Sequence, residues 1–495
     1  MHTIPLNKKN LSTLEGFIKV PSYDLESIET GIVHIGVGGF HRSHQAYYIH
    51  QLLEQGQGGD WGICGVGLRE EDREINRVLH QQDFLYSLVT QHPNQTTHSE
   101  IIGSMTDFIL AVDEPQKVID VMAQANTKIV SMTITEGGYN FDPHTLTFNF
   151  DNPLVQFEIQ HPDQPQTVFG FLTAALKIRK EKGDLPFTIL SCDNIQHNGD
   201  MTRNMLMSFV ERQAPSLVSW IEEHVCFPNT MVDRITPVTS SETREYLHIH
   251  HHVHDEWPVI CEPYIQWVIE DTFSNGRPKL ENLGVQFVQD VSPYEKMKIR
   301  LLNAGHSVLG IPGALYGHPT IDACMRDSVF SEFMRKFMDE EATKVVGKIE
   351  GIDLEEYKNS LENRFVNPNI KDGLSRICSQ SSAKLPKFLF PTIKENLLSG
   401  ASIKYGTFVL AAWCFYHWKR VDNNNHPIEI IDDLQDQLHQ YAKASQHDEL
   451  SFLKLSTLFG ELSEEERFIQ VYKRSMDMLN AESNIREVMN HMLSN

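Results

Sequence analysis

The sequence predicts an α/β protein with a parallel-sheet N-terminal domain and a mainly α-helical C-terminal domain. Up to about residue 290, short β-branched apolar runs alternate with helix-like stretches, which is the pattern of parallel βαβ units. Beyond that point the hydrophobic periodicity is mostly helical. A chain of 495 residues is long enough for two or three domains with separate cores. We expect the first domain, with its extensions, at 1–290 and the second at 291–495.

Composition and charge are those of a globular protein with an acidic surface. The chain has 43 basic and 66 acidic residues, and its formal net charge is −23. This excess of acids argues against nucleic acids and anionic membranes as partners. The seven scattered cysteines form no CxxC pair, which is typical of reduced thiols. The sequence has no signal-peptide core and no apolar run long enough to span a bilayer, so we expect a cytoplasmic protein. We expect a monomer or a small homo-oligomer, although the sequence does not fix the oligomeric state.

The predicted elements follow from periodicity. After a strand that should be buried on both faces, Ala46, Ile49, Leu52 and Leu53 recur at helical spacing. Strands of the first domain are expected at 32–37, 61–68, 129–134 and 187–190. Helices of the second domain are expected at 294–310, 328–340, 354–362, 392–399, 403–419, 429–443 and 464–480.

A histidine-rich run, HIHHHVH at 248–254, raises the question of a metal site. No Asp, Glu or Cys accompanies it at a spacing suited to metal ligands. We therefore predict a polar surface loop at this run, and no metal in the protein.

A glycine turn follows the first predicted strand, in IVHIGVGGFHRSHQ at 32–45. In a dinucleotide-binding fold the first glycine makes the turn, the second lets the backbone approach the pyrophosphate, and the third allows close helix packing. Gly36 and Gly38 hold the first two positions, His41 holds the third, and Gly39 is an addition. Taken alone, the turn also suits an ordinary strand-to-helix corner.

Acidic residues follow the second predicted strand. Glu71 and Asp72 lie where a carboxylate accepts a hydrogen bond from the adenosine ribose of NAD and repels the 2′-phosphate of NADP. The surrounding REEDR could equally be a solvated charged loop. Together with the glycine turn, these acids favour an NAD-binding Rossmann-like domain.

The predicted helix at 294–310 carries three polar side chains of catalytic type. At about 100° per residue, His306 lies about 80° and Asn303 about 140° from Lys298, opposite an apolar stripe of Met297, Leu301, Ala304 and Val308. A solvated face would also explain them. Oxidation of an alcohol, however, needs a base for the hydroxyl proton and donors for the oxygen, and lysine, amide and imidazole supply these.

Further polar clusters occur in SCDNIQHNG (191–199), MVDRITP (231–237) and RICSQSSAKLPK (376–387). The first follows a predicted strand, where α/β sheets bind ligands. The other two add an acid and several cations.

These segments resemble the mannitol dehydrogenase family, the polyol-specific long-chain dehydrogenases. The resemblance runs from residue 32 to about 393, in HIGVGGFHRSHQAYY, CGVGLREEDR, TITEGGY, SCDNIQHNG, MVDRITP, CEPYIQWVIED, NGRP, MKIRLLN and SSAKLPKF. It implies zinc-independent, NAD-dependent interconversion of a polyol and a ketose. Where many relatives have LLNGSH, this chain has Leu301–Leu302–Asn303–Ala304–Gly305–His306.

The resemblance also implies roles for single residues. Lys298 would be the catalytic base, Asn194 and Asn303 would polarise the reacting oxygen, and His306 would bind the substrate beside them. Glu295 would relay protons to Lys298. The distal hydroxyls would be held by Asp233, Arg376 and Lys384, and NAD would contact Gly36, Gly38, Phe40 and Asp72.

Four functions remain to be weighed. The leading one is interconversion of D-mannitol and D-fructose, which TEGGY at 135–139 fits better than the TEKGY of uronate enzymes. The alternatives within the family are reduction of a hexuronate such as fructuronate and oxidation of sorbitol or arabinitol. A non-catalytic NAD sensor is disfavoured because Lys298, Asn194 and Asn303 are all present.

Overall fold

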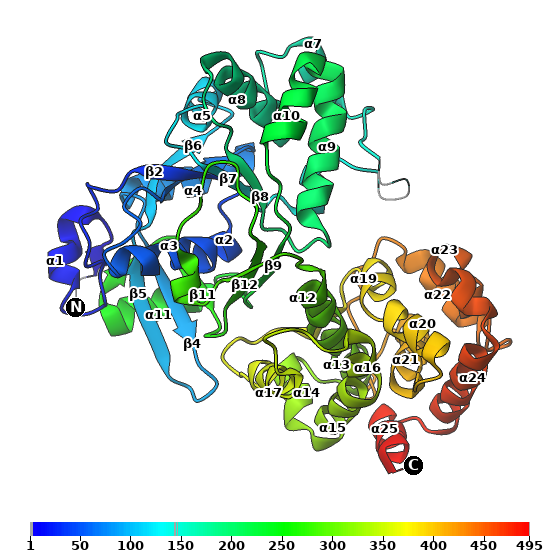
Figure 1. Ribbon diagram of the computed structural model, residues 1–495. Coiled ribbons are helices and arrows are strands. Elements are labelled where there is room, and N and C mark those ends of the chain that lie inside the picture. Colours follow the sequence, from blue (N-terminus) through cyan, green and yellow to red (C-terminus); the bar gives the residue numbers. More distant parts are fainter. Residues whose placement is uncertain (1–2, 143–144, 146, 495) are drawn as a thin grey trace. The chain divides into compact units, whose positions relative to one another are not determined.

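The computed structural model describes residues 3–142, 145 and 147–494. The chain divides into two compact units (Figure 1). Unit 1 consists of Met1–His92 and Thr96–Ser292, and unit 2 consists of Pro93–Gln95 and Pro293–Asn495.

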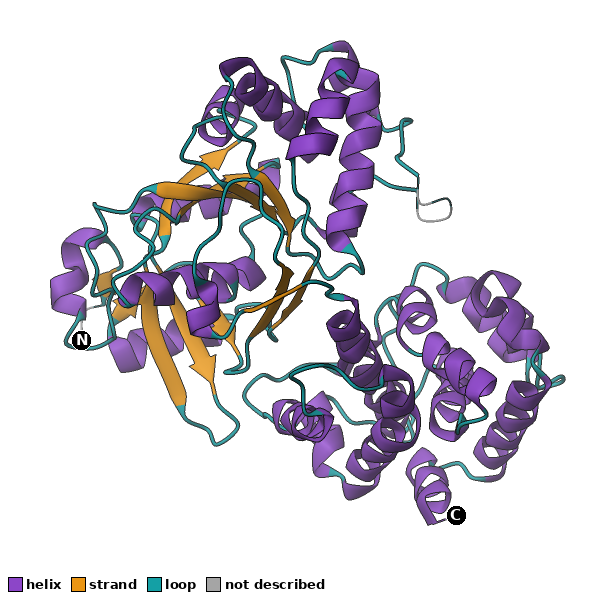
Figure 2. Ribbon diagram, viewed as in Figure 1, coloured by secondary structure: helices purple, strands orange, loops and turns teal. Residues whose placement is uncertain are grey.

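A five-stranded parallel sheet forms the centre of unit 1 (Figure 2). Its order is β6-β3-β2-β7-β8, so the first strand of the sheet along the chain, β2, has the second on one side and the fourth on the other. This is the Rossmann order, and ligands bind at the carboxyl edge where the order reverses. The strands are β2 (Thr30–Ile35), β3 (Gly62–Gly67), β6 (Met105–Leu110), β7 (Ile129–Met132) and β8 (Thr188–Ser191).

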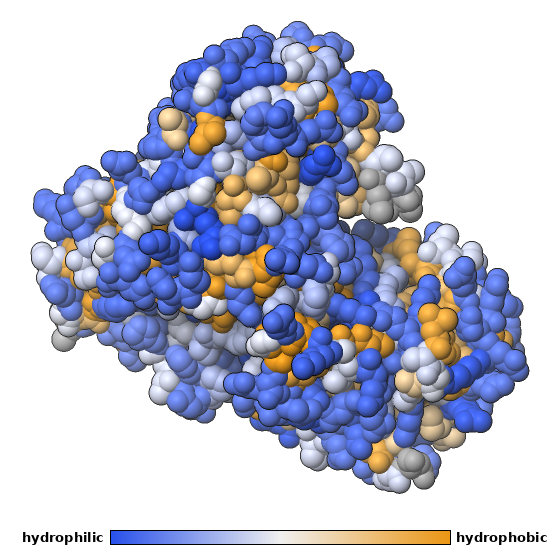
Figure 3. Space-filling view, in the orientation of Figure 1, coloured by the Kyte–Doolittle hydropathy of each residue, from blue (hydrophilic) through white to orange (hydrophobic). Residues whose placement is uncertain are grey.

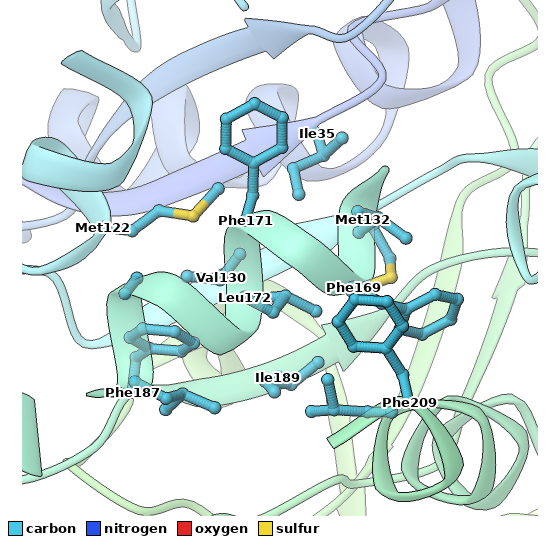
Figure 4. Packing of buried hydrophobic residues seen from close by; sticks show 14 of the residues in the cluster. Ile35, Met122, Val130, Met132, Phe169, Phe171, Leu172, Phe187, Ile189 and Phe209 are labelled. Atoms are coloured by element: carbon cyan, nitrogen blue, oxygen red, sulfur yellow. The ribbon is translucent and has the colours of Figure 1, made fainter. Parts of the chain in front are cut away.

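Helices cover both faces of this sheet. On one face, Ile35, Met132 and Ile189 of the strands belong to one core cluster with Phe169 and Phe171 of α8 and Phe209 of α9 (Figure 4). On the other face, the apolar stripe of α3 packs against β2 and β3 as its spacing predicts. Burial of each such side chain stabilises the fold by about 1.5–3 kcal/mol. The longer helices of the unit are α3 (Gln45–Glu54), α4 (Arg73–Gln81), α5 (Pro115–Met122), α7 (Pro153–Gln160), α8 (Val168–Lys182), α9 (Asn198–Gln213) and α11 (Ser241–His251).

Smaller sheets surround the central one, and their short strands were not predicted. Their orders are β13-β12-β9, β11-β4-β5 and β1-β10. They comprise β9 (Thr230–Asp233), β12 (Gln266–Glu270), β13 (Gln286–Val288), β4 (Tyr86–Gln91), β5 (Thr97–Ile102), β11 (Val259–Cys261), β1 (Ile4–Pro5) and β10 (Val253–His254). Short helices complete the unit: α1 (Leu11–Leu14), α2 (Gly39–Ser43), α6 (Thr135–Gly138) and α10 (Val218–His224).

Unit 2 is helical throughout its described elements. Its central helix, α21 (Lys404–Lys419), is buried from Tyr405 to His417, so it is apolar on all sides rather than along one stripe. Around it lie α13 (Ala304–Tyr316), α14 (Ile321–Arg326), α15 (Ser328–Phe337), α16 (Thr343–Val346), α17 (Leu354–Phe365), α18 (Leu374–Cys378), α19 (Ser381–Phe388), α20 (Phe390–Ser399), α22 (Gln435–Ala444), α23 (Ser456–Phe459), α24 (Glu466–Ala481) and α25 (Ile485–Ser494). Before α13, α12 (Ser292–Met297) leads into a π-helical turn at Lys298–Asn303.

The predicted fold class, a Rossmann-like unit with a helical second unit, is confirmed. Two local predictions need correction. The helix predicted at 429–443 begins only at Gln435. The loop predicted at the histidine run is wrong: His248–His251 form the last turn of α11, and Val253–His254 form β10. Buried Thr243 and Leu247 anchor that helix and leave its polar residues at the surface.

The surface is mainly hydrophilic. On the face drawn in Figure 3, hydrophilic residues predominate and the hydrophobic ones gather in separate small patches. All seven cysteines are free thiols. None of the helices among the described residues combines the length and the hydrophobicity needed to cross a membrane.

Candidate active site

Gly36 makes the turn at the end of β2. Its φ of +89° lies in the left-handed region that favours glycine. A Cβ at this position would lie 2.2 Å from the Thr133 carbonyl oxygen, which follows β7. The Thr133 hydroxyl donates to the Gly36 carbonyl at 2.7 Å and closes the contact. The turn therefore lies at the reversal point of the sheet, between its first and fourth strands.

Gly38 leaves the next position open for a ligand. It is the exposed N-cap of α2, and a Cβ there would meet no atom of the described residues within 4 Å beyond its chain neighbours. The position after Gly39 holds Phe40, whose ring stacks on His44 with centroids 4.9 Å apart. Such a bare backbone at a helix start fits the pyrophosphate of a dinucleotide.

His41 occupies the position of the missing third glycine. Its ring is buried and stacks on His34 of β2, with centroids 3.4 Å apart. His34 in turn lies 2.8 Å from the Ser131 hydroxyl, and burial lowers the pKa of His34 to about 3. Two stacked neutral rings thus join helix and strand, where a third glycine would let the backbones touch.

The predicted ribose acids follow β3 as expected, but they differ in their surroundings. Asp72 is half-buried, and its carboxylate accepts from the Arg69 backbone N–H at 3.0 Å. Glu71 is exposed. Neighbouring Glu70 is held by Arg73 at 2.6 Å. Asp72 is therefore the better ordered of the two predicted acids.

Asn194 follows β8 at the same carboxyl edge. It is exposed, and the residue before it is a buried anchor. The Asp193 carboxylate accepts from the backbone N–H groups of Ile134 and Thr135 at 3.0 and 2.9 Å, and from the Tyr139 hydroxyl at 2.7 Å. Burial raises the pKa of Asp193 above its usual value. Asp193 and Tyr139 belong to two of the motifs named above. Nothing in the sequence indicates that hydrogen bonds to Asp193 connect the ends of β7 and β8.

Asp233 is the last residue of β9. It is buried and lies opposite Gln266 in an antiparallel pair with β12. The next residue, Arg234, donates to the Glu262 carbonyl at 3.0 Å and lies 4.8 Å above the Tyr47 ring. These contacts fix the strand end that carries Asp233.

In unit 2, the predicted catalytic helix is continuous but not α-helical throughout. Lys298–Asn303 form a π-helix, and the Ala304 N–H bonds to the Ile299 carbonyl five residues back. In a π-helical turn, the next residue along the helix axis is five positions further along the chain, whereas in an α-helix it is three or four positions further. Asn303 therefore lies closer to Lys298 around the axis than the angle predicted for an α-helix.

The polar residues of this helix are enclosed by protein. Relative exposures are 7% for Lys298, 8% for Asn303 and 5% for Glu295. His306 is half-buried and stacks on Phe365 of α17, with ring centroids 4.3 Å apart. The alternative of a solvated face is therefore wrong. Phe365 was not predicted, because the sequence carries no local signal for a ring contact across 59 positions.

Arg376 and Lys384 lie together at α18 and α19. The Arg376 side chain is 62% exposed and forms a two-point ion pair with Asp372. The Lys384 ammonium donates to the carbonyls of Arg376 and Ile377 at 3.3 and 3.1 Å, and to the Ser379 hydroxyl at 3.4 Å. Burial, and then the charge of Arg376, lower the pKa of Lys384.

Within each unit, several of the predicted residues come from the same sheet edge or from helices that pack together. Gly36, Gly38 and Asn194 lie at the carboxyl edge of the central sheet of unit 1. In unit 2 the turn that carries Lys298 packs against α19, the helix that carries Lys384. Among the described residues, no three His, Cys, Asp or Glu side chains are grouped so that they could hold a metal ion.

Comparison with known proteins decides the family. Residues 30–282 match the mannitol dehydrogenase Rossmann domain, and residues 290–480 match the mannitol dehydrogenase C-terminal domain. The chain belongs to the mannitol dehydrogenase family. A mannitol 2-dehydrogenase of Neosartorya fischeri is 42% identical over 488 residues, covering 96% of this chain and 97% of its own length. One of Aspergillus fumigatus is 41% identical over the same length.

Solved structures agree with this membership. The ternary complex of Pseudomonas fluorescens mannitol 2-dehydrogenase with NAD and D-mannitol has a TM-score of 0.88 and 42% identity, covering 99% of this chain and 100% of the other. Substrate-free D-sorbitol dehydrogenase has a TM-score of 0.91 and 33% identity, covering 98% and 100%. The predicted family is confirmed, and so is the predicted enzyme class, an NAD-dependent oxidoreductase acting on CH–OH groups.

Substitution of Gly36 tests whether the turn needs a glycine at this position. Gly36→Ala should destabilise unit 1 by at least about 1–3 kcal/mol, because alanine is strained at positive φ and its Cβ meets Thr133. NADH binding, measured by fluorescence titration, should weaken with it. In the control Gly39→Ala, the new Cβ lies 3.6 Å from Thr236 Cγ2, an ordinary contact, so binding should persist. Equal binding by both variants would contradict this account of the turn.

Proposed function

We propose that this chain interconverts D-mannitol and D-fructose with NAD, without a metal. The observation that carries the proposal is the enclosed Lys298 with Asn303 on one π-helical turn, in a chain 42% identical to a mannitol 2-dehydrogenase. A neutral lysine can accept the hydroxyl proton, and amides donate well to the alkoxide or carbonyl oxygen. We further propose a cytoplasmic location and a monomer or small homo-oligomer.

Each polar residue has a separate task in this proposal. Lys298 Nζ takes the proton of the reacting hydroxyl, while the Asn194 and Asn303 amides hold the same oxygen. NAD supplies the chemistry of hydride acceptance when it is bound. His306, kept in orientation by the Phe365 ring, binds the neighbouring hydroxyl. Glu295, three residues before Lys298, passes the proton on to solvent.

Cofactor contacts follow from the glycine turn and the acids after β3. The half-buried turn at Gly36 and the exposed backbone of Gly38 suit the pyrophosphate, and the Phe40 ring borders it. Asp72 and Glu71 are proposed to accept hydrogen bonds from the hydroxyl groups of the adenosine ribose. The ordered carboxylate of Asp72 supports NAD over NADP, because it repels a 2′-phosphate.

The distal hydroxyls are assigned to Asp233, Arg376 and Lys384. A neutral polyol is favoured over a hexuronate because Asp372 already compensates the Arg376 guanidinium. The three donors of the Lys384 ammonium are also directed to two carbonyls and a hydroxyl. A uronate carboxylate needs a charge-assisted contact, best of all a two-point one, and Asp233 would repel it.

The variant Lys298→Ala tests the proposal that Lys298 is the general base. We expect kcat to fall at least roughly a hundredfold, the scale of a lost acid–base group, while NADH binding in fluorescence titrations stays intact. Lys336→Ala, at an exposed ion pair with Glu340, is the control and should keep full activity. Activity of the wild type should also survive EDTA. Loss of activity in EDTA with recovery on added zinc would overturn the lysine mechanism.

The preference for NAD over NADP tests the proposed role of Glu71 and Asp72. Glu71→Lys combined with Asp72→Ala should shift the ratio of kcat/KM values from NAD toward NADP, because it replaces repulsion of the 2′-phosphate by attraction. Glu70→Ala serves as control, since that carboxylate is bound by Arg73. An unchanged ratio in the double variant would mean that the ribose is bound elsewhere.

The substrate is tested by comparing two ketones side by side. With NADH at one pH, fructose should be reduced with a higher kcat/KM than fructuronate, because a uronate carboxylate would lack its charge-assisted contact. A tenfold or greater advantage for fructuronate would refute the mannitol assignment and leave the family membership intact.

A further inference from the structure

Lys298 is flanked in the sequence by two cations that share one carboxylate. Lys296 Nζ lies 2.6 Å from Glu395 Oε2, and Arg300 Nη2 lies 3.6 Å from Glu395 Oε1. Glu395 belongs to α20. Residues four apart lie on one face of a helix, and the residue midway between them lies on the opposite side. Glu395 therefore binds the side of the helix that is turned away from Lys298.

Arg300 connects the π-helical turn to a third element. Its Nη1 donates to the Lys387 carbonyl of α19 at 3.0 Å. The side chain is only 9% exposed, and burial lowers the pKa of Arg300, while Glu395 opposes that shift. A buried charge that loses its partner is strongly destabilising, so this guanidinium has little freedom to move. Through it, the turn that carries Lys298 is joined to the helix that carries Lys384.

We propose that Arg300 and Glu395 are positioning residues, which hold the π-helical turn on α19 and α20 and thereby align Lys298 and Asn303 with Lys384. The inference rests on the proposed role of Lys298 as the base. Neither residue needs to touch the substrate. A π-helical turn is rare, and a misplacement of about 1 Å at a reacting group costs up to roughly a hundredfold in rate.

The test uses Glu395→Gln in the full chain, which keeps the side-chain shape but removes the charge that Lys296 and Arg300 share. We expect kcat for mannitol oxidation to fall roughly tenfold or more, with KM for mannitol within about threefold of the wild type. NADH affinity should stay unchanged, because the glycine turn belongs to unit 1. The primary isotope effect on kcat, with mannitol deuterated at the oxidised carbon, should increase because the chemical step becomes slower.

Matched variants separate positioning from general stability. Glu395→Asp keeps the charge and should recover most of kcat. Glu340→Gln removes a carboxylate from the surface pair with Lys336, 3.2 Å away in the same unit, and should leave kcat and the isotope effect unchanged. Arg300→Lys keeps the charge but loses the forked contact to Lys387 and Glu395, so it should lower kcat as Glu395→Gln does, with KM for mannitol within about threefold of the wild type. It gives the same test if Glu395→Gln does not fold.

Three outcomes overturn the inference, and they can be distinguished. If Glu395→Gln and Arg300→Lys keep the kcat and isotope effect of the wild type while Lys298→Ala is inactive, positioning by this pair is wrong and the proposed function stands. If Lys298→Ala itself keeps the kcat of the wild type, the lysine mechanism is wrong and the inference loses its basis. A folded Glu395→Gln enzyme with a lower melting temperature but normal kcat would also overturn it.

Discussion

The close approach of β2 and β7 at Gly36 is the constraint on which the geometry of the cofactor end depends. The sheet order reverses between these two strands, so their carboxyl ends form the crevice in which a dinucleotide is bound. The crevice stays narrow because Gly36 presents no side chain to the Thr133 carbonyl. Any Cβ at this position would push apart the two strands that define the crevice. The glycine is thus a requirement of packing first, and its proposed contact with the cofactor is a consequence.

Buried polar contacts keep this edge of the sheet rigid. The His34 ring lies between the Ser131 and Thr133 hydroxyls, at 2.8 and 3.1 Å. One strand further, Asp193 accepts from two backbone N–H groups that follow β7. Each contact satisfies a polar group that would be costly to bury alone. Strand ends and loops open most easily, so such contacts hold in place the segment in which Asn194 is proposed to act.

The sequence allowed prediction of the features that depend on local pattern. The parallel strands, the glycine turn after β2 and the polar side chains around Lys298 all follow from periodicity and spacing. The π-helical turn could not be predicted, because it differs from an α-helix by one residue in a single turn. Its anchor also lies far away, with Lys296 and Glu395 separated by 99 positions. The loop predicted over the histidine run failed because two buried residues outweighed the polar composition of α11.

Charge at the distal end of the proposed site is arranged differently from what the sequence suggests. The sequence brings two cations, Arg376 and Lys384, into one segment. In the structure, Asp372 neutralises the arginine, and backbone carbonyls accept hydrogen bonds from the lysine ammonium. These carbonyls come from α18, so Lys384 also stabilises a helix end where the backbone has acceptors without partners in the helix. Substrate hydroxyls can exchange with such contacts one at a time, because each is a modest hydrogen bond. A carboxylate would have to displace Asp372 from Arg376 to gain a comparable contact, and this cost supports the proposal of a neutral polyol as the substrate.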